Sequence, residues 1–284
     1  MALKINQNIM AANAARNLKH LGTTDGTSAS RLSSGLRINQ GDSEGLALRE
    51  MMRADIGSLN QGMRNADEAI CLIDEADAAL SVIGDNVTRM RELAEQAATG
   101  TYTDAQRVMI DKEFQAQKTE IDRIANSASH NGIHMLNAAP EAQQASRIEN
   151  SGGLKVHFGM GNEMGEDYYV IAFHDVTAKG LGMANLNAAT QEQALEALNG
   201  LADSVIRADR ARADLGAVRN RLENTRSNLQ LCAENVQAAE SRIRDVDVAG
   251  EMAQLARNQI LNAAQVALLR QANSVPQTAL SLIG

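Results

Sequence analysis

The two ends of the chain are its most apolar helical stretches, and neither has a partner elsewhere in the sequence. The run at 260–269 reads Ile-Leu-Asn-Ala-Ala-Gln-Val-Ala-Leu-Leu, which puts apolar side chains nearly all the way round a helix. Residues 1–21 have the same character. A helix that is apolar on every side must be buried on every side. We therefore predict that another copy of the chain covers both ends, so that the protein self-assembles.

The large aliphatic side chains of the two ends are predicted to make this contact. They are Ile5, Ile9, Leu18, Leu21, Ile260, Leu261, Leu268, Leu269, Leu280 and Leu282.

The composition argues against an enzyme and against a nucleic-acid-binding protein. Aromatic residues make up 2% of the chain and Trp is absent, which is too few for an ordinary enzyme core. No nucleophile–base set or pair of carboxylates stands out, and no cofactor is predicted. Residues 43–250 carry a net charge of −12 and the ends carry +4, giving −8 for the whole chain. A nucleic-acid-binding protein needs a basic stripe instead.

The sequence shows neither a secretory signal nor a membrane span. Asn6, Gln7, Asn8 and Asn13 interrupt the apolar run near the N-terminus. No stretch approaches the roughly 18–20 apolar residues that a spanning helix needs. Taken alone, these features indicate a cytosolic protein.

Three stretches of the middle have apolar residues at alternating gaps of four and three. This repeat predicts helices wrapped in a left-handed supercoil. The first stripe contains Met52, Ile56, Leu59, Met63, Ala66, Ile70 and Ile73, then Leu80, Ile83, Val87, Met90, Ala94 and Ala97. The second contains Ile110, Phe114, Gln117, Ile121, Ile124 and Ala128, and the third runs from Ala211 through Leu222 and Cys232 to Val246.

One stretch has the alternation of a β-hairpin. Apolar residues alternate with polar ones at 154–158 and again at 169–173, on either side of a Gly-rich turn. Residues 138–152 are polar and are predicted to form a loop, and Asn131-Gly132 predicts a turn.

The predicted fold is mainly α: a long antiparallel helical rod with coiled-coil packing and one small β-hairpin, plus terminal helices that form an inner coiled coil. The predicted domains are an N-terminal helix and linker at 1–43, a rod at 44–245 with the hairpin near 154–174, and a C-terminal helix at 246–284.

Other candidate sites have simpler interpretations. His130 and His134 have the spacing of a helical metal pair, but they straddle the predicted turn, which disfavours a metal site. Gly159, Gly161 and Gly165 lack the spacing of a phosphate loop and favour a hairpin turn. The basic run at 207–212 is interpreted as a solvated face.

The two cysteines, Cys71 and Cys232, are predicted not to pair within one chain. If the first and third rod helices run antiparallel from a base near residues 44 and 244, the two lie about 20 Å apart along the rod, beyond the ~7 Å Cα limit for a disulfide. Cys232 lies on the third stripe, so we predict that it is buried, whereas Cys71 is predicted to be partly exposed.

Motifs at both ends resemble those of bacterial flagellin, over about 1–137 and 175–284. They include Ile5-Asn6-Gln7-Asn8, the run from Arg31 to Asn39, the run from Arg89 to Ala94, Asn220-Arg221-Leu222, the run from Ala239 to Asp245, and Gln271-Ala272-Asn273. The chain differs from the family at Ile73-Asp74-Glu75-Ala76-Asp77, where Gln-Thr-Ala-Glu-Gly is usual. It also lacks the large outer domains of many flagellins, and it ends in Leu282-Ile283-Gly284.

The resemblance implies a structural subunit of the bacterial flagellar filament that serves swimming motility. The terminal helices would line the inner tube of the filament and the rod would form the outer tube. The chain would leave the cell through the flagellar export channel without a cleaved signal peptide, so its expected location is extracellular. Expected partners are further copies of itself, an export chaperone, the filament cap and the hook–filament junction proteins. The alternative is a junction protein of the same flagellum, which shares the terminal helices.

The resemblance also implies a second contact surface, at Arg89, Leu93 and Glu113. In recognised flagellins the matching positions lie on one face of the rod. There they contact neighbouring subunits and are read by a Toll-like receptor of animals.

Overall fold

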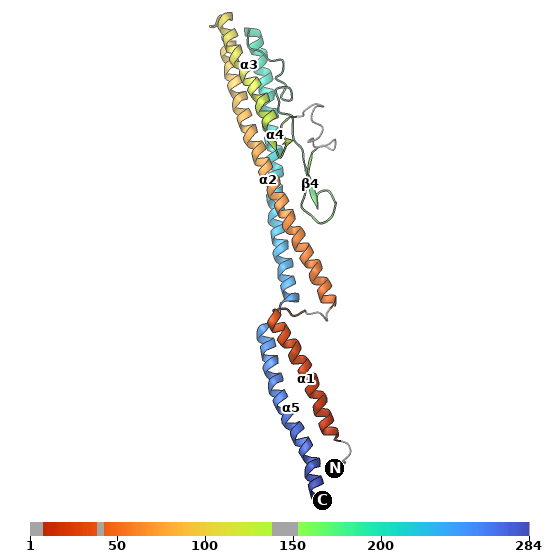
Figure 1. Ribbon diagram of the computed structural model, residues 1–284. Helices are drawn as coiled ribbons and strands as arrows, with labels where there is room; N and C mark the ends of the chain where they lie inside the picture. The colour runs from red at the N-terminus through yellow and green to blue at the C-terminus, as the bar shows by residue number, and fades with distance from the viewer. Residues whose placement is uncertain (1–7, 39–42, 138–152, 284) are drawn as a thin grey trace. The chain divides into compact units, whose positions relative to one another are not determined.

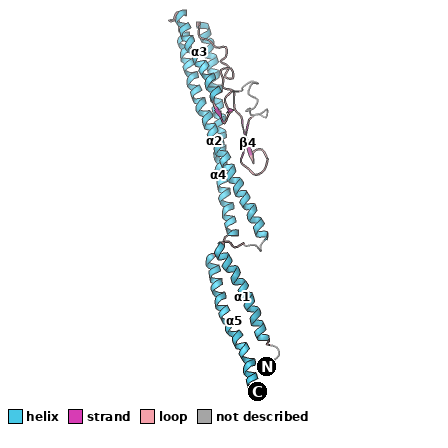
Figure 2. Ribbon diagram, in the orientation of Figure 1, coloured by secondary structure: helices cyan, strands magenta, loops and turns pink. Residues whose placement is uncertain are grey.

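The computed structural model describes residues 8–38, 43–137 and 153–283, and within them the chain is mainly α (Figures 1 and 2). The helices are α1 (Ile9–Ser34), α2 (Ser43–Ala98), α3 (Asp104–Ser127), α4 (Gln191–Arg244) and α5 (Val248–Ile283). The long helices pair with one another, and two small two-stranded sheets accompany them. The predicted fold class is confirmed. Among the described residues, no helix is long and apolar enough to cross a membrane.

The chain divides into two units, residues 1–54 with 235–284 and residues 55–234. In the second unit the predicted stripes of α2 and α3 form the core. Ile73, Leu80, Ile83, Val87, Met90, Phe114 and Ile121 are all at most 1% exposed. Leu201, Leu215 and Leu222 of α4 join the same cluster. The coiled-coil prediction for this unit is therefore confirmed.

Three Arg–Asp pairs fix the antiparallel register of α2 and α4. Arg226 pairs with Asp67 at 3.0 Å, Arg219 with Asp74 at 2.7 Å and Arg212 with Asp77 at 2.9 Å. The arginines are seven residues apart and so lie along one edge of α4. The solvated-face interpretation of the basic run is consistent with the structure, because Arg207 and Arg210 are exposed and the Arg212 side chain is 41% exposed. Arg207 also donates to the Gly180 carbonyl at 3.2 Å. Two of the paired aspartates, Asp74 and Asp77, belong to the stretch where the chain departs from the family pattern.

Side chains of α3 hold the irregular segment at 176–190 against the core. Asp122 accepts a hydrogen bond from the Ala178 amide at 2.8 Å, and Asp111 accepts one from the Ala188 amide at 2.7 Å. The segment buries apolar side chains between these anchors, among them Leu181 and Met183. Because this segment forms no regular secondary structure, the aspartate side chains accept hydrogen bonds from its backbone amides in place of a strand or helix partner.

The predicted hairpin is present. Strand β3 (Leu154–His157) pairs antiparallel with β4 (Tyr168–Ile171), with Val156 opposite Tyr169. The turn prediction at Asn131-Gly132 is also confirmed. Both residues have positive φ, 49° and 80°, as a tight two-residue hairpin turn requires.

That turn joins a second hairpin, which the prediction of a single one missed. It consists of β1 (Ser129–His130) and β2 (Ile133–His134). Strands of two residues are too short to show alternation in a sequence.

The β3–β4 hairpin docks where α2 has a glycine. A Cβ atom at Gly62 would lie 2.1 Å from the Phe158 carbonyl oxygen, so only glycine lets the two backbones meet. Beside it, Asn65 donates to the His157 carbonyl at 2.7 Å. On the other side, the Arg221 guanidinium of α4 lies 4.1 Å from the centre of the Tyr169 ring. The hairpin therefore contacts both long helices.

In the first unit, α1 and α5 run antiparallel side by side (Figure 1). Asn8 donates to the Ala272 carbonyl at 2.7 Å, and Asn262 donates to Asp25 at 2.5 Å. Helix α1 ends where Gly35 adopts a left-handed conformation, with φ of 71°.

Candidate self-assembly interface

The contact between α1 and α5 combines leucines with small and polar side chains of both helices. The buried and half-buried residues of α5 recur every three or four positions: Glu251, Leu255, Asn258, Asn262, Gln265, Leu269 and Ala272. Those of α1 include Ala11, Ala14, Leu18, Leu21, Asp25, Ser28 and Leu32. We call these two rows the seam. Four of the seven seam residues of α5 are polar, which is unusual for the buried side of a helix pair.

Eight other large apolar side chains of the same helices lie outside the seam. Ile260 is 71% exposed, Leu268 53% and Ile9 61%, and Met10 and Leu261 are exposed as well. Val248, Met252 and Val266 extend this set along α5. Soluble chains rarely leave so many large aliphatic groups uncovered on neighbouring elements, and such patches mark interaction sites. We call these eight residues the outer apolar surface.

The predicted assembly residues divide between these two places. Ile9, Ile260, Leu261 and Leu268 belong to the outer apolar surface, where another copy can reach them. Leu18, Leu21 and Leu269 are half-buried in the seam and contact the other helix of the same chain. Ile5 and the side chains of Leu280 and Leu282 lie outside the described residues.

Of the three residues predicted for the second contact surface, Arg89 and Glu113 are exposed and Leu93 is not. Arg89 on α2 pairs with Glu113 on α3 at 2.8 Å, and with Glu92 at 2.9 Å. The hydrogen bond to Glu113 raises the pKa of Arg89. Leu93 does not reach the surface, because it is 1% exposed and packs in the core beneath the pair.

Of the histidines and glycines considered as metal or phosphate sites, His130 and the glycines have structural partners. His130 contacts Glu75 at 2.9 Å, while the Nδ1 atom of His134 is buried without a partner among the described residues. The Asp167 carboxylate fills the β3–β4 turn and accepts hydrogen bonds from the Gly161 and Glu163 amides, both at 2.9 Å. These bonds, the one from Glu163 first, lower the pKa of Asp167. A carboxylate in this position excludes a phosphate, so the glycines serve a turn, as predicted.

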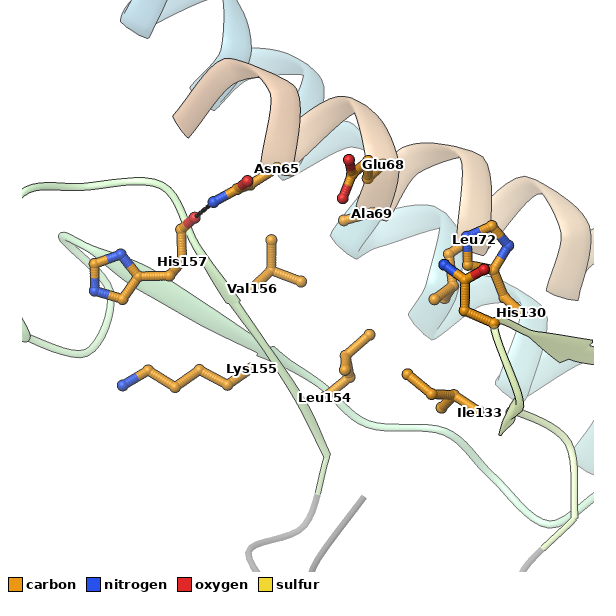
Figure 3. Close-up of a pocket in the computed structure, with 11 residues that line it drawn as sticks. Asn65, Glu68, Ala69, Leu72, His130, Ile133, Leu154, Lys155, Val156 and His157 are labelled. Carbon is orange, nitrogen blue, oxygen red and sulfur yellow. Dashed lines mark hydrogen bonds between the residues drawn. The ribbon is translucent and has the colours of Figure 1, made fainter. Parts of the chain in front are cut away.

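A pocket of about 320 Å³ lies between α2, the β1–β2 turn and β3 (Figure 3). Its floor is apolar, with Ala69, Leu72 and Val156, and Ile133 and Leu154 close it on one side. Two of the polar groups at its rim are already engaged, since Lys155 donates to Asn162 at 2.8 Å and Asn65 to the His157 carbonyl. Within the described residues, no group of three or more metal-ligating side chains is present.

Both cysteines are free and exposed. The prediction that Cys71 is exposed is confirmed, and the prediction that Cys232 is buried is wrong. The buried row of α4 passes through the neighbouring Ala233, which is 8% exposed. The stripe advances by one position there, because a helix of 3.6 residues per turn drifts away from a strict repeat of 3.5.

We expect both thiols to react with a thiol reagent in the folded monomer, at rates within about tenfold of each other. The Asp67–Arg226 and Asp74–Arg219 pairs place Cys71 level with residue 222, about ten residues or about 15 Å from Cys232. That offset is too large for an internal disulfide. Thiol titration before and after denaturation measures this, and a monomer without free thiols would contradict the register.

Two family models match the chain. The bacterial flagellin N-terminal helical region matches residues 5–140, and the bacterial flagellin C-terminal helical region matches residues 198–283. The chain is 38% identical to flagellin FlaB2 of Treponema pallidum, over 98% of this chain and 99% of that protein. It is 36% identical to a flagellin of Bacillus subtilis, over 99% of this chain and 100% of that protein.

Solved structures resemble the chain as well. Bacillus cereus flagellin matches with a TM-score of 0.51 and 28% identity, over 58% of this chain and 88% of that one. A putative flagellar hook-associated protein from Vibrio parahaemolyticus matches with a TM-score of 0.58 over 71% of this chain and 98% of that one. Its identity is 13%, so it shows likeness of fold alone.

Proposed function

This chain belongs to the bacterial flagellin family and is a structural, non-enzymatic subunit of the extracellular flagellar filament, and on that premise we propose that the outer apolar surface of α1 and α5 is its polymerisation contact. The single observation that carries the proposal is the exposure of large apolar side chains on this helix pair. Ile9 is 61% exposed, Ile260 71% and Leu268 53%. Neighbouring copies of the chain supply the apolar cover that these side chains need, through a heterologous contact that can repeat along a filament.

In this proposal the three predicted segments occupy different parts of the filament. Residues 1–43 and 246–284 form the inner tube of the filament, and residues 44–245 form the outer tube. The helix boundaries support this division, because α1 ends at Ser34 and α2 begins at Ser43, while α4 ends at Arg244 and α5 begins at Val248. The proposed limits lie beside these breaks, whereas the two compact units divide about ten residues further along α2 and earlier in α4, at 54/55 and 234/235.

The same surface suits the partners that a subunit meets before it is added to the filament. We infer that an export chaperone covers α5 in the cytoplasm, because its exposed apolar side chains would otherwise aggregate. The filament cap and the hook–filament junction proteins are proposed to contact subunits at the two ends of the polymer.

Electron microscopy of the purified protein tests the polymerisation contact. Concentrated protein, seeded with short filament fragments, should grow into long filaments in which the outer apolar surface is protected from hydrogen exchange. Short or absent growth would favour the junction protein as the alternative. Growth with α1 and α5 still fully exchangeable would contradict the proposed contact.

We also propose that the Arg89–Glu113 pair is read by the Toll-like receptor, with Leu93 supporting it from below. Replacing Arg89 and Glu113 together by alanine removes the two hydrogen bonds between them and the one from Arg89 to Glu92, and should weaken receptor activation by about 10–100-fold. Reporter cells that carry the receptor measure the effect. The matched control is Arg123→Ala, which removes another exposed ion pair of α3, with Glu120. A wild-type monomer that fails to activate these cells would refute the receptor role.

A further inference from the structure

Two short segments of the first unit lie side by side where its helices meet. Residues 35–37 follow directly after α1, and residues 243–246 include the end of α4 and lead into α5. Leu36 and Asp245 are opposite each other in an isolated antiparallel bridge between the two segments. We call these two segments the junction.

Two backbone hydrogen bonds flank this bridge. The Arg37 amide donates to the Arg244 carbonyl at 2.7 Å, and the Val246 amide donates to the Gly35 carbonyl at 3.1 Å. In this antiparallel pattern the two residues between the bonds have Cα atoms about 4.5 Å apart. The end of α1 is therefore fixed against the start of α5.

The Arg37 side chain adds a second link, at the end of α4. Its Nε atom and one terminal nitrogen both donate to the Ile243 carbonyl, at 3.1 and 3.0 Å. The last four carbonyls of a helix have no partner within it, and a cation is favourable at this end of the helix dipole. Together with its backbone bond to Arg244, Arg37 thus satisfies the last two carbonyls of α4.

The other arginine of the junction is held elsewhere and does not duplicate Arg37. Arg244 pairs with Glu240 at 3.0 Å and with Asp245 at 2.7 Å. Glu240 is 4% exposed, so a movement of Arg244 away from it would leave a buried carboxylate without its cation. The link from the first segment to the end of α4 therefore depends on the Arg37 guanidinium.

We propose that Arg37 is a positioning residue for polymerisation: through the junction it holds α1 beside α5 and so places Ile9 relative to Ile260. This inference rests on the proposed function, because a contact made by both helices needs them in one arrangement. Helix α1 has 26 residues and is about 40 Å long, so a tilt of about 10° at the junction would move Ile9 by about 7 Å. Apolar side chains touch only within about 4–4.5 Å, so a neighbouring copy would then lose part of the contact.

Hydrogen exchange of the full-length monomer at low concentration tests the junction without polymerisation. The amides of Arg37 and Val246 should be protected, because both donate within the junction. Arg37→Ala removes the two side-chain bonds and should raise the exchange rates of both amides by about tenfold. Arg37→Lys keeps one cationic donor and should lie between the two. Arg257→Ala is the control, since it removes an exposed arginine of α5 outside the junction and should leave both rates unchanged.

A disulfide across the junction separates positioning from direct contact between Arg37 and a neighbouring copy. Leu36→Cys with Asp245→Cys, in a Cys71→Ala, Cys232→Ala background, puts two thiols at bridge partners whose spacing suits a disulfide. Adding Arg37→Ala to this reduced parent should raise the critical concentration for filament growth by about tenfold. Oxidation of the same protein should return it to the value of the parent, because the disulfide then holds the two segments together.

Normal filaments from Arg37→Ala would overturn the inference. A deficit that the disulfide does not repair would also overturn it, because Arg37 would then act in some way other than through the junction. So would unprotected Arg37 and Val246 amides in the wild-type monomer. Failure of the proposed assembly contact would appear separately, as normal filaments from Leu268→Asp with both amides still protected in its monomer.

Discussion

Leu268→Asp should stop filament growth while residues 55–234 remain folded. The Leu268 side chain is 53% exposed in the chain and belongs to the outer apolar surface. In the filament another copy covers it, which is worth about 1.5–3 kcal/mol per leucine. An aspartate in the same place adds a desolvation cost of about 1–3 kcal/mol. Since 1.4 kcal/mol corresponds to tenfold, the critical concentration for growth should rise by about 10²–10⁴-fold.

Sedimentation of seeded protein across a range of concentrations measures that critical concentration. Ile9→Asp should act in the same way from α1, because Ile9 is also exposed and outside the seam. Leu268→Met is the matched control: it keeps an apolar side chain of similar volume and should polymerise almost normally. Far-UV circular dichroism of each monomer separates failed assembly from failed folding. Normal filaments from either aspartate variant would show that the outer apolar surface is not the assembly contact.

The helices of the second unit could be predicted from the sequence because their signal is local. A repeat of apolar residues at gaps of four and three identifies the buried row of a helix without knowledge of its partner. Positions such as Leu80, Ile83 and Phe114 were found in this way, and they form the observed core. The hairpin at 154–171 was predicted for the same reason, since alternation is also local.

Contacts between distant segments could not be predicted in this way. Nothing in the local pattern around Gly62 says that the Phe158 carbonyl will rest on it. The Arg219–Asp74 pair depends on the register of two helices that are far apart in sequence. Leu93 was placed at a surface by resemblance, yet its spacing from Met90 and Ala97 already indicates a core position.

The composition of the terminal helices indicated self-assembly, but it did not show which side chains lie between α1 and α5. Their apolar character indicates burial, and from it we predicted that another copy covers ends without a partner in the chain. The structure pairs α1 with α5, buries Asn258 and Ser28 between them and leaves Ile260 exposed. The row Glu251, Leu255, Asn258, Asn262 has heptad spacing in the sequence, but a polar row is ordinarily assigned to the solvent side. In a subunit whose exposed apolar side chains become buried in a polymer, a polar row can face the partner helix while large apolar side chains face outward.

Two glycines of α2 should respond in opposite directions when they are replaced by alanine. Both substitutions gain the same helix propensity, about 0.5–1 kcal/mol. At Gly57 the new methyl group meets nothing within 4 Å, so Gly57→Ala should stabilise the protein by about that amount. At Gly62 the methyl group would lie 2.1 Å from the Phe158 carbonyl oxygen and 3.0 Å from its carbon. The β3–β4 hairpin must move away, so Gly62→Ala should cost about 1–3 kcal/mol net.

The tyrosines make this difference measurable. The chain has three tyrosines and no tryptophan, and two of the tyrosines, Tyr168 and Tyr169, lie on β4. Tyrosine fluorescence therefore reports mainly on the hairpin, while far-UV circular dichroism reports on the helices. In urea, Gly62→Ala should lose the tyrosine signal at a lower concentration than the helical signal, because the Asn65–His157 hydrogen bond and the burial of Phe158 are lost first. Gly57→Ala should shift both transitions together to higher urea. If the two variants unfold alike, the hairpin does not rest on α2 at Gly62, and its close backbone contact is not what holds it there.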